Sequence, residues 1–342
     1  MPMNLLRRHA TSALVALLLS NLALQTANAG TISWVTVGDP GNTADSSLYG
    51  NVSSSFQIMQ YEWTNSLYAE FLNAVDPNGT NPNDIYNTSM GTNVRGGISF
   101  TSGAAAGSKY AVKTDMGDKP VNYVSWFDAA RVANWLQNGQ GSGSTETGAY
   151  TLNNATTGNA PAVNAGAQFY LPTENQWYKA AYYKSGGTNA GYWAYTTGSD
   201  TAPTAVSANS TGVGSAGNTG NFVNAANAAD WNGENGNVTT VGTNGGPSPY
   251  NTFDMGGNVS EWNDLTGLIA GSARGTRGGN WSGNVNGSLF STRAEQIPTN
   301  ETNGIGFRLA SSAVVPEPST WVMGLAGIAC GGWQMLRRRR AQ

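Results

Sequence analysis

Pairs of carboxylates are the first side chains in this sequence that could carry out a reaction. Hydrolysis of a glycosidic bond needs two carboxyl groups at a set separation, one as the acid and one as the base or nucleophile. Glu174 with Glu261, or Asp230 with Glu234, could supply them. The sequence favours neither pair, and the helix dipole alone favours an acidic residue such as Glu174 in a first turn.

Histidine and cysteine are missing from the central part of the chain. The only histidine is His9 and the only cysteine is Cys330, and both lie in the terminal segments. Cys/His zinc sites, Ser-His-Asp triads, cysteine nucleophiles and histidine-bound iron or copper are therefore excluded between residues 30 and 312. A disulfide framework is excluded as well.

Three helices are predicted to position the central residues. The first has apolar residues at helical spacing over 67–75 and stops at the Asp-Pro-Asn-Gly sequence of 76–79. The second extends to about Gln137, and the third begins after the Leu-Pro of 171–172. Each begins with a capping signal: Thr64, Ser125 with Asp128, and Thr173 with Gln176.

Short strands and long loops are predicted for the rest of the domain. Strand character occurs at 31–38, 98–100 and 110–112, and alternation of apolar and polar residues at 56–59 predicts a half-buried strand. Short strands and tight turns are expected again from residue 254 to 310. Residues 186–246 show little periodicity, which is unusual in a compact domain unless something organises the loops.

The N-terminus has the three parts of a secretory signal. Arg7 and Arg8 precede an apolar run from Ala13 to Leu24, and the Ala27-Asn28-Ala29 sequence fits a signal-peptidase site. We therefore expect residues 1–29 to be a signal peptide that signal peptidase removes after Ala29. A retained membrane anchor is the alternative, but the apolar run is short for spanning a bilayer.

The C-terminal segment, 313–342, has a similar three-part order. The Pro316-Glu317-Pro318 motif precedes an apolar run over 321–336, and the chain then carries Arg337, Arg338, Arg339 and Arg340. This order resembles the PEP-CTERM sorting signal of Gram-negative bacteria that produce exopolysaccharide. The resemblance implies a transmembrane helix that is inserted transiently and removed by an exosortase. An ordinary single-span anchor is the alternative.

The charge balance argues against one class of partner. Six of the 17 basic residues lie in the two terminal segments, whereas only one of the 20 acidic residues does, so the domain between them is acidic. A nucleic-acid-binding protein needs a basic surface. We therefore expect no nucleic-acid partner.

Five motifs, in order, resemble the sulfatase-modifying-factor, or formylglycine-generating enzyme, superfamily. They are PVNYVSWFDAARVANWL, LPTENQWYKAAYY, DMGGNVSEW, RGGNW and GFRLA, and Tyr170 departs from the arginine usual before the second. The resemblance implies one domain over 30–312. Its fold would be α+β, a C-type-lectin-like variant with little regular secondary structure and long ordered loops.

The same resemblance argues against the oxidase activity of the family. Its oxidases bind copper through two cysteines after the Gly-Gly-x-aromatic motif, and these positions correspond to about Gly283 and Ser288. Other relatives use iron held by histidines, which the domain lacks. We expect neither copper nor iron, and the sequence favours a non-catalytic domain.

Structural calcium is a further implication of the resemblance. The family site corresponds to the carboxylates of Asp254 and Glu261 with backbone carbonyls of Gly257 and Val259, which are hard oxygen ligands suited to Ca²⁺. A second family site would lie near Asn221, with the backbone oxygen of the next residue. The alternative is that Glu261 pairs with Arg293 or Arg308 while Asp254 caps a turn.

The expected function is that of an exported protein at the cell surface or in the extracellular matrix, with a binding or structural role near exopolysaccharide or biofilm. The alternatives are a family enzyme with a non-standard site, either sulfatase-modifying or related to non-heme-iron oxidoreductases, and a carbohydrate-active hydrolase. Polysaccharide is a candidate partner because several aromatic residues could line a sugar-binding groove: Trp193, Tyr195, Trp231, Trp262 and Trp281. The core is the favoured position for Trp262 and Trp281, which lie in family motifs, whereas Trp193 and Trp231 lie in loops and are less decided.

Overall fold

The computed structural model describes residues 32–265 and 270–312 of the chain. The three predicted helices are present as α2 (Asn65–Val75), α4 (Trp126–Gln137) and α5 (Glu174–Tyr182). Two shorter helical segments, η1 (Pro82–Asp84) and α3 (Ser89–Thr92), follow α2. A third, η2 (Val285–Ser288), follows the RGGNW motif. The α+β class expected from the sequence is confirmed.

The predicted helix caps are confirmed at all three sites. The Thr64 side chain accepts a hydrogen bond from the Leu67 amide. Reciprocal capping boxes join Ser125 with Asp128 in α4 and Thr173 with Gln176 in α5. Each cap satisfies amides that the first turn of a helix leaves without partners.

Within the described residues, the strands are short and form two sheets of four strands and two sheets of two strands. The first large sheet has the order β1 (Trp34–Val37), β2 (Phe56–Met59), β12 (Ala310–Ser311) and β5 (Phe169–Tyr170). The second has the order β10 (Ala294–Gln296), β9 (Arg274–Arg277), β8 (Ser260–Asn263) and β11 (Ile305–Gly306). The predicted strands β3 (Ile98–Phe100) and β4 (Tyr110–Val112) pair antiparallel, whereas β6 (Thr204–Ala205) and β7 (Phe222–Val223) pair parallel.

Burial of β2 differs from the half-buried strand that its alternation predicts. All four residues of β2 are buried, including Gln57, which is 8% exposed. The reason is that β2 lies between β1 and β12 and separates two apolar clusters. Met59 packs in one cluster, and Phe56 and Ile58 pack in the other.

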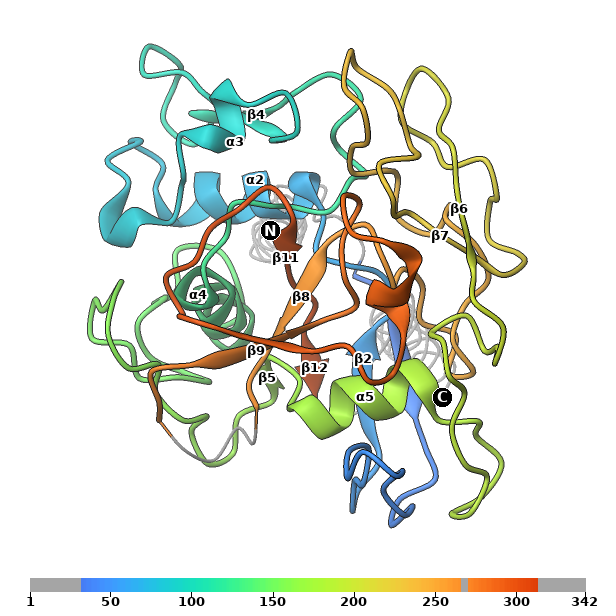
Figure 1. Cartoon of the computed structure of the whole chain (residues 1–342). Coiled ribbons are helices and arrows are strands. Elements are labelled where there is room, and N and C mark those ends of the chain that lie inside the picture. Colours follow the sequence, from blue (N-terminus) through green and yellow to red (C-terminus); the bar gives the residue numbers. More distant parts are fainter. Residues whose placement is uncertain (1–31, 266–269, 313–342) are drawn as a thin grey trace, which may run out of the picture. The chain divides into compact units, whose positions relative to one another are not determined.

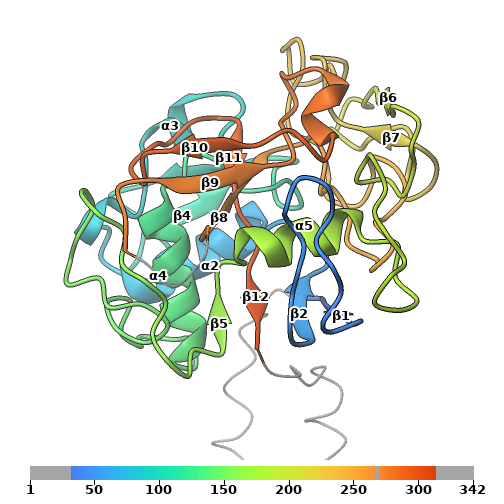
Figure 2. The ribbon, with the colours of Figure 1, turned by 60° about the horizontal axis from the view of Figure 1, so that its bottom comes forward.

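Helix α5 lies between the two large sheets (Figure 2). Its Trp177 and Tyr178 belong to the same apolar cluster as Ile58 of β2, and its Glu174 binds Arg277 of β9. Helices α2 and α4 lie on one side of these sheets, and the loops around β6 and β7 lie on the other (Figure 1). The largest apolar cluster contains the inner faces of α2 and α4.

Candidate functional site

The two candidate metal carboxylates are engaged within the protein. Glu261 is fully buried on β8, and its two oxygens accept hydrogen bonds of 2.6 Å each from Nε and Nη2 of Arg308. The Trp177 indole also donates to Glu261, at 2.8 Å. Of the two ion pairs considered from the sequence, the one with Arg308 is present, whereas Arg293 pairs with Glu174.

Arg308 is the centre of a buried acidic cluster that also contains Glu62, a residue that the sequence patterns do not single out. Burial and the nearby Asp254 and Glu261 carboxylates raise the pKa of Glu62 well above its usual range. Glu62 accepts hydrogen bonds from the Asn258 side chain and the Val259 amide, at 2.8 and 3.2 Å. Three carboxyl groups therefore share a single guanidinium, and the raised pKa of Glu62 favours its neutral, protonated form.

Asp254 has the turn-capping contacts that the sequence allowed as an alternative. Its carboxylate accepts from the Gly242 amide and from the Asn244 side chain, the latter at 2.9 Å. Burial raises the pKa of Asp254 despite these hydrogen bonds. Asp254 also borders a polar cavity of about 10 Å³, which is enough space for one water molecule or an occupant of similar size.

The second candidate metal site lies beside the first, because Phe222, the residue that follows Asn221, lines the same cavity as Asp254. Asn221 is bound to the preceding loop, where its side chain accepts from Thr197 and donates to the Thr201 carbonyl at 2.9 Å. Gly257 and Val259 provide backbone only, and the Gly257 amide donates to the Gly278 carbonyl. Within 32–265 and 270–312, no three His, Cys, Asp or Glu side chains are grouped so that they could hold a metal ion.

Gly283 and Ser288, the positions that match the family cysteines, have local roles. Ser288 ends η2, is 1% exposed, and donates its hydroxyl to the Val285 carbonyl at 2.7 Å. The Gly283 carbonyl accepts from the Ala226 amide. A glycine and a buried, hydrogen-bonded serine cannot supply the thiolates that copper binding needs.

Three of the four carboxylates suggested by the sequence are held in ion pairs, whereas Asp230 is exposed and accepts one backbone hydrogen bond. Glu174 binds both Arg277 and Arg293 at 2.8 Å, and Glu261 is held by Arg308 as described. Glu234 pairs with Arg95 at 2.7 Å, and Asp230 accepts from the Gly236 amide. These contacts give all four carboxylates structural partners.

The candidate aromatic residues divide into core and surface. Trp262 is fully buried, Trp231 and Trp281 are each 6% exposed, and Tyr195 is 9% exposed. Arg95 covers the Trp281 ring at 4.3 Å and Lys119 covers Trp231 at 4.9 Å. Trp193 alone is only partly buried, so the five residues do not form one groove.

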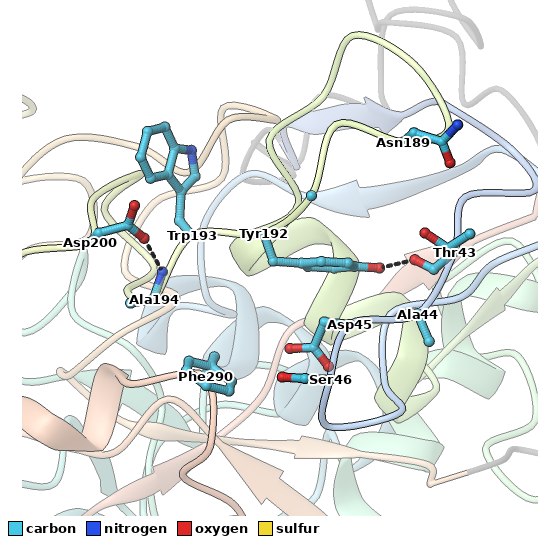
Figure 3. A pocket seen from close by; sticks show the side chains of 11 residues that line it. Thr43, Ala44, Asp45, Ser46, Asn189, Tyr192, Trp193, Ala194, Asp200 and Phe290 are labelled. Atoms are coloured by element: carbon cyan, nitrogen blue, oxygen red, sulfur yellow. Dashed lines mark hydrogen bonds between the residues drawn. The ribbon is translucent and has the colours of Figure 1, made fainter.

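Trp193 lines a pocket of about 530 Å³ (Figure 3). Its walls come from the loop between β1 and β2, from the segment after α5, and from Phe290, which lies just after η2. Tyr192 and Phe290 add aromatic surface, and Asp45 and Asp200 add carboxylates. The size and the mixture of aromatic and polar groups are typical of small-molecule sites.

Hydrogen bonds fix the pocket walls in place. The Tyr192 hydroxyl donates to the Thr43 carbonyl at 2.8 Å, and the Ala194 amide donates to Asp200 at 3.0 Å (Figure 3). Asp45 accepts from the Ser47 amide at 2.6 Å and from the Tyr178 hydroxyl of α5. Apart from Trp193, the sequence patterns do not identify this pocket, because its residues come from segments without periodicity.

The predicted terminal signals lie outside the described residues. This applies to the cleavage site at Ala27 and Ala29, to the Pro316-Glu317-Pro318 motif, and to the apolar run and arginines after it. None of the helices within 32–265 and 270–312 is long and apolar enough to cross a bilayer.

Comparison with known proteins supports the motif resemblance. The sequence matches the family described as "Sulfatase-modifying factor enzyme 1-like domain" over residues 35–313. No curated protein matches the chain.

Among the solved structures that are similar to this chain, three share 17–22% sequence identity with it. Treponema denticola variable protein 1 is 19% identical, with 82% of this chain and 95% of that chain covered and a TM-score of 0.48. CarF is 22% identical, with coverage of 82% and 98% and a TM-score of 0.47. PvdO from Pseudomonas aeruginosa is 17% identical, with coverage of 83% and 92% and a TM-score of 0.42.

Proposed function

We propose that this chain, which belongs to the sulfatase-modifying factor enzyme 1-like family, is an exported surface or matrix protein that binds carbohydrate and does not catalyse a reaction. The observation that carries the proposal is the pocket beside Trp193, with a volume of about 530 Å³. Aromatic rings accommodate the apolar faces of sugars, and carboxylates and amides accept or donate hydrogen bonds to hydroxyl groups.

Residue chemistry supports binding over the oxidase activity of the family. Gly283 and Ser288 replace the cysteines that the family oxidases use, and the single histidine and cysteine lie in the terminal segments. The carboxylates Glu174 and Glu261 are held by arginines. The preformed pocket walls also favour binding, because little ordering is needed when a ligand enters.

Export and sorting form the second part of the proposal. Signal peptidase would cleave after Ala29, and an exosortase would act at Pro316-Glu317-Pro318 after transient membrane insertion of the C-terminal segment. The domain would then reach the cell surface or matrix. Replacing Glu317 and both prolines by alanine should leave the protein unprocessed in the membrane fraction. Processing of this variant at the wild-type rate would contradict sorting by the motif.

Structural calcium is the third part, centred on Asp254. Asp254 carries a buried carboxyl group beside the cavity of about 10 Å³, and a cation there would stabilise the ionised form that burial disfavours. Oxygen donors of this kind suit Ca²⁺. The proposed role of the ion is to order loops that have no disulfides.

A glycan-binding experiment tests the carbohydrate site. Purified domain should bind a subset of oligosaccharides, and Trp193→Ala should weaken binding about tenfold or more, as expected when a central tryptophan is removed. Phe100→Ala is the matched control, because Phe100 is also a partly exposed aromatic residue (39%) and lies outside the pocket. Equal binding by the Trp193 variant would overturn the proposal.

Turnover measurements separate binding from catalysis. The bound oligosaccharides should be recovered intact, and the domain should consume no oxygen with cysteine-containing sulfatase peptides. Release of shorter sugars that one carboxylate substitution abolishes would instead establish a hydrolase. Oxygen consumption would establish a family oxidase with a non-standard site.

A further inference from the structure

Resting on the carbohydrate site proposed above, we infer that the Trp193 pocket selects sugars that carry a free amine. Its ligand would then be a polysaccharide or oligosaccharide with positively charged hexosamine units. The inference starts from the charge of the pocket. Asp45 and Asp200 contribute carboxylates from two different loops, and no lysine or arginine is among the residues that line it.

The two carboxylates are oriented by the protein. One oxygen of Asp200 accepts from the Ala194 amide, and Asp45 accepts from Ser47 and Tyr178. An ionised carboxylate has about four acceptor positions, so both groups can accept further hydrogen bonds from a ligand. An ammonium group is the strongest partner for such sites because both members of the hydrogen bond are charged.

Nearby arginines do not cancel the negative charge of the pocket. Arg277 stacks on Tyr178 at 4.9 Å, and Tyr178 donates a hydrogen bond to Asp45, but Arg277 is paired with Glu174 at 2.8 Å. Arg293 is paired with Glu174 and Glu295. Because these two arginines have their own carboxylates, they leave the charges of Asp45 and Asp200 uncompensated.

The Trp193 ring already binds an ammonium group. The amine of Lys184 lies 4.2 Å from the centre of the indole, a typical cation-π contact. The aromatic wall of the pocket is thus suited to positive charge as well as to a sugar face. The Lys184 ammonium group would also compete with a ligand amine for the Trp193 ring, because the two positive charges repel each other.

Size and polar lining favour a sugar over the side chain of a basic peptide. A volume of about 530 Å³ is large for a single extended lysine chain. Thr43, Ser46 and Asn189 also line the pocket and suit a ligand with several hydroxyl groups. An aminated sugar satisfies the carboxylates, the hydroxyl and amide groups, and the aromatic rings together.

Calorimetric titration with two matched ligands tests the inference. Fully deacetylated glucosamine oligomers and their N-acetylated counterparts of equal length differ in charge but share the sugar backbone. The free-amine oligomer should bind about tenfold more tightly at low salt, and added salt should reduce the difference. Equal binding of both oligomers, sensitive to Trp193→Ala, would overturn the amine preference and leave the carbohydrate site intact.

Single-residue variants locate the effect. Asp200→Asn keeps the acceptor for the Ala194 amide and removes the charge, so it should lose about tenfold affinity for the free-amine oligomer only. Asp118→Asn, an aspartate outside the pocket, should not change binding. Lys184→Met should strengthen binding of the free-amine oligomer.

Two results would contradict the inference through these variants. If Asp200→Asn keeps the full preference for the free-amine oligomer, the Asp200 carboxylate takes no part in recognising the amine. If an oligolysine peptide binds more tightly than glucosamine oligomers, the acidic pocket is a site for a basic peptide and not for an aminated sugar. Failure of every oligosaccharide to bind would overturn the proposed function itself, which is a separate outcome.

Discussion

The helical region around α2 and α4 and the loop region of residues 186–258 are ordered by different interactions. In the helical region, apolar side chains of both helices share the largest buried cluster. In the loop region, the regular structure is limited to the short strands β6 and β7, and buried amides take the place of a large apolar core. Asn224 donates to the Asn237 carbonyl, the Thr239 hydroxyl and the Asn258 side chain.

Close backbone packing accompanies the amide network. Gly257 has a φ of +79°, and a Cβ atom at this position would lie 2.2 Å from the Asn224 carbonyl oxygen. Only glycine fits such a contact. The comparison teaches that side-chain amides and closely packed glycines can order a long segment without periodicity, even though the buried Asn224 Oδ1 and Asn237 Nδ2 atoms have no hydrogen-bond partner.

Removing a large side chain from the helical cluster should have the largest effect. Phe71 is fully buried and packs against Tyr68 and Trp135, with ring centres 5.4 and 5.5 Å apart. Phe71→Ala should lower the free energy of unfolding by about 3–5 kcal/mol, measured by urea denaturation. Phe100→Ala, at a partly exposed site, should cost clearly less. Equal losses of unfolding free energy in the two variants would mean that the burial of Phe71 does not determine its contribution to stability.

The next largest effect from a substitution is expected in the loop network. Asn224→Ala removes one donor group that serves three acceptors and should cost about 1–3 kcal/mol. Hydrogen exchange should show lost protection mainly in residues 224–258. Asn235→Ala, at a neighbouring position outside this network, is the control. A loss of protection in α2 equal to that in the loops would contradict separate stabilisation of the two regions.

Calcium removal should also distinguish the regions. If Ca²⁺ binds at Asp254, a concentration one hundredfold above its Kd stabilises the protein by about 2.7 kcal/mol. A chelator should then lower the Tm and increase exchange in the loops while α4 stays protected. Asp254→Asn should lose the response to chelator. An unchanged Tm in wild-type protein would contradict structural calcium.

Loss of a helix cap should have a smaller effect, limited to the helical region. The Ser125 hydroxyl accepts from the Asp128 amide at 3.1 Å at the start of α4. Ser125→Ala should cost about 1 kcal/mol in thermal or urea unfolding. Ser125→Thr, which retains the hydroxyl, should preserve most of the stability. A similar loss in both variants would indicate that packing at residue 125, and not the cap, is responsible.

The last expected effect is a dependence of stability on pH in the helical region. Burial, followed by the charge of Glu301, raises the pKa of Asp128 to about 7. A carboxyl with a raised pKa binds its proton more tightly in the folded protein than in the unfolded chain, where the pKa is about 3.9. The contribution of Asp128 to the free energy of unfolding should therefore fall as pH rises from about 4 to about 7.

Glu301→Gln tests this contribution by removing one cause of the raised pKa. The variant should lose less stability than the wild type between pH 5 and pH 7, measured by urea unfolding at both values. Glu295→Gln, at a side chain that is 53% exposed, is the control and should follow the wild type. An identical pH dependence for all three proteins would exclude coupling between Glu301 and Asp128.

The sequence by itself determined the helices, their caps and the family. Helical spacing over 67–75 and the pairs Ser125–Asp128 and Thr173–Gln176 are local signals, and local hydrogen bonds form wherever the chain carries them. The five ordered motifs identified the family, and with it the α+β fold with little regular secondary structure. The absence of histidine and cysteine from the domain is likewise a property of composition alone.

Only the tertiary structure decided which partners the charged and aromatic residues have. Glu261 binds Arg308, 47 residues away, and Arg293 binds Glu174, 119 residues away. The pocket joins Asp45, Trp193 and Phe290 from three loops that carry no periodic signal. Contacts between distant segments depend on how the sheets and α5 pack, so residue type and spacing along the chain could not specify them.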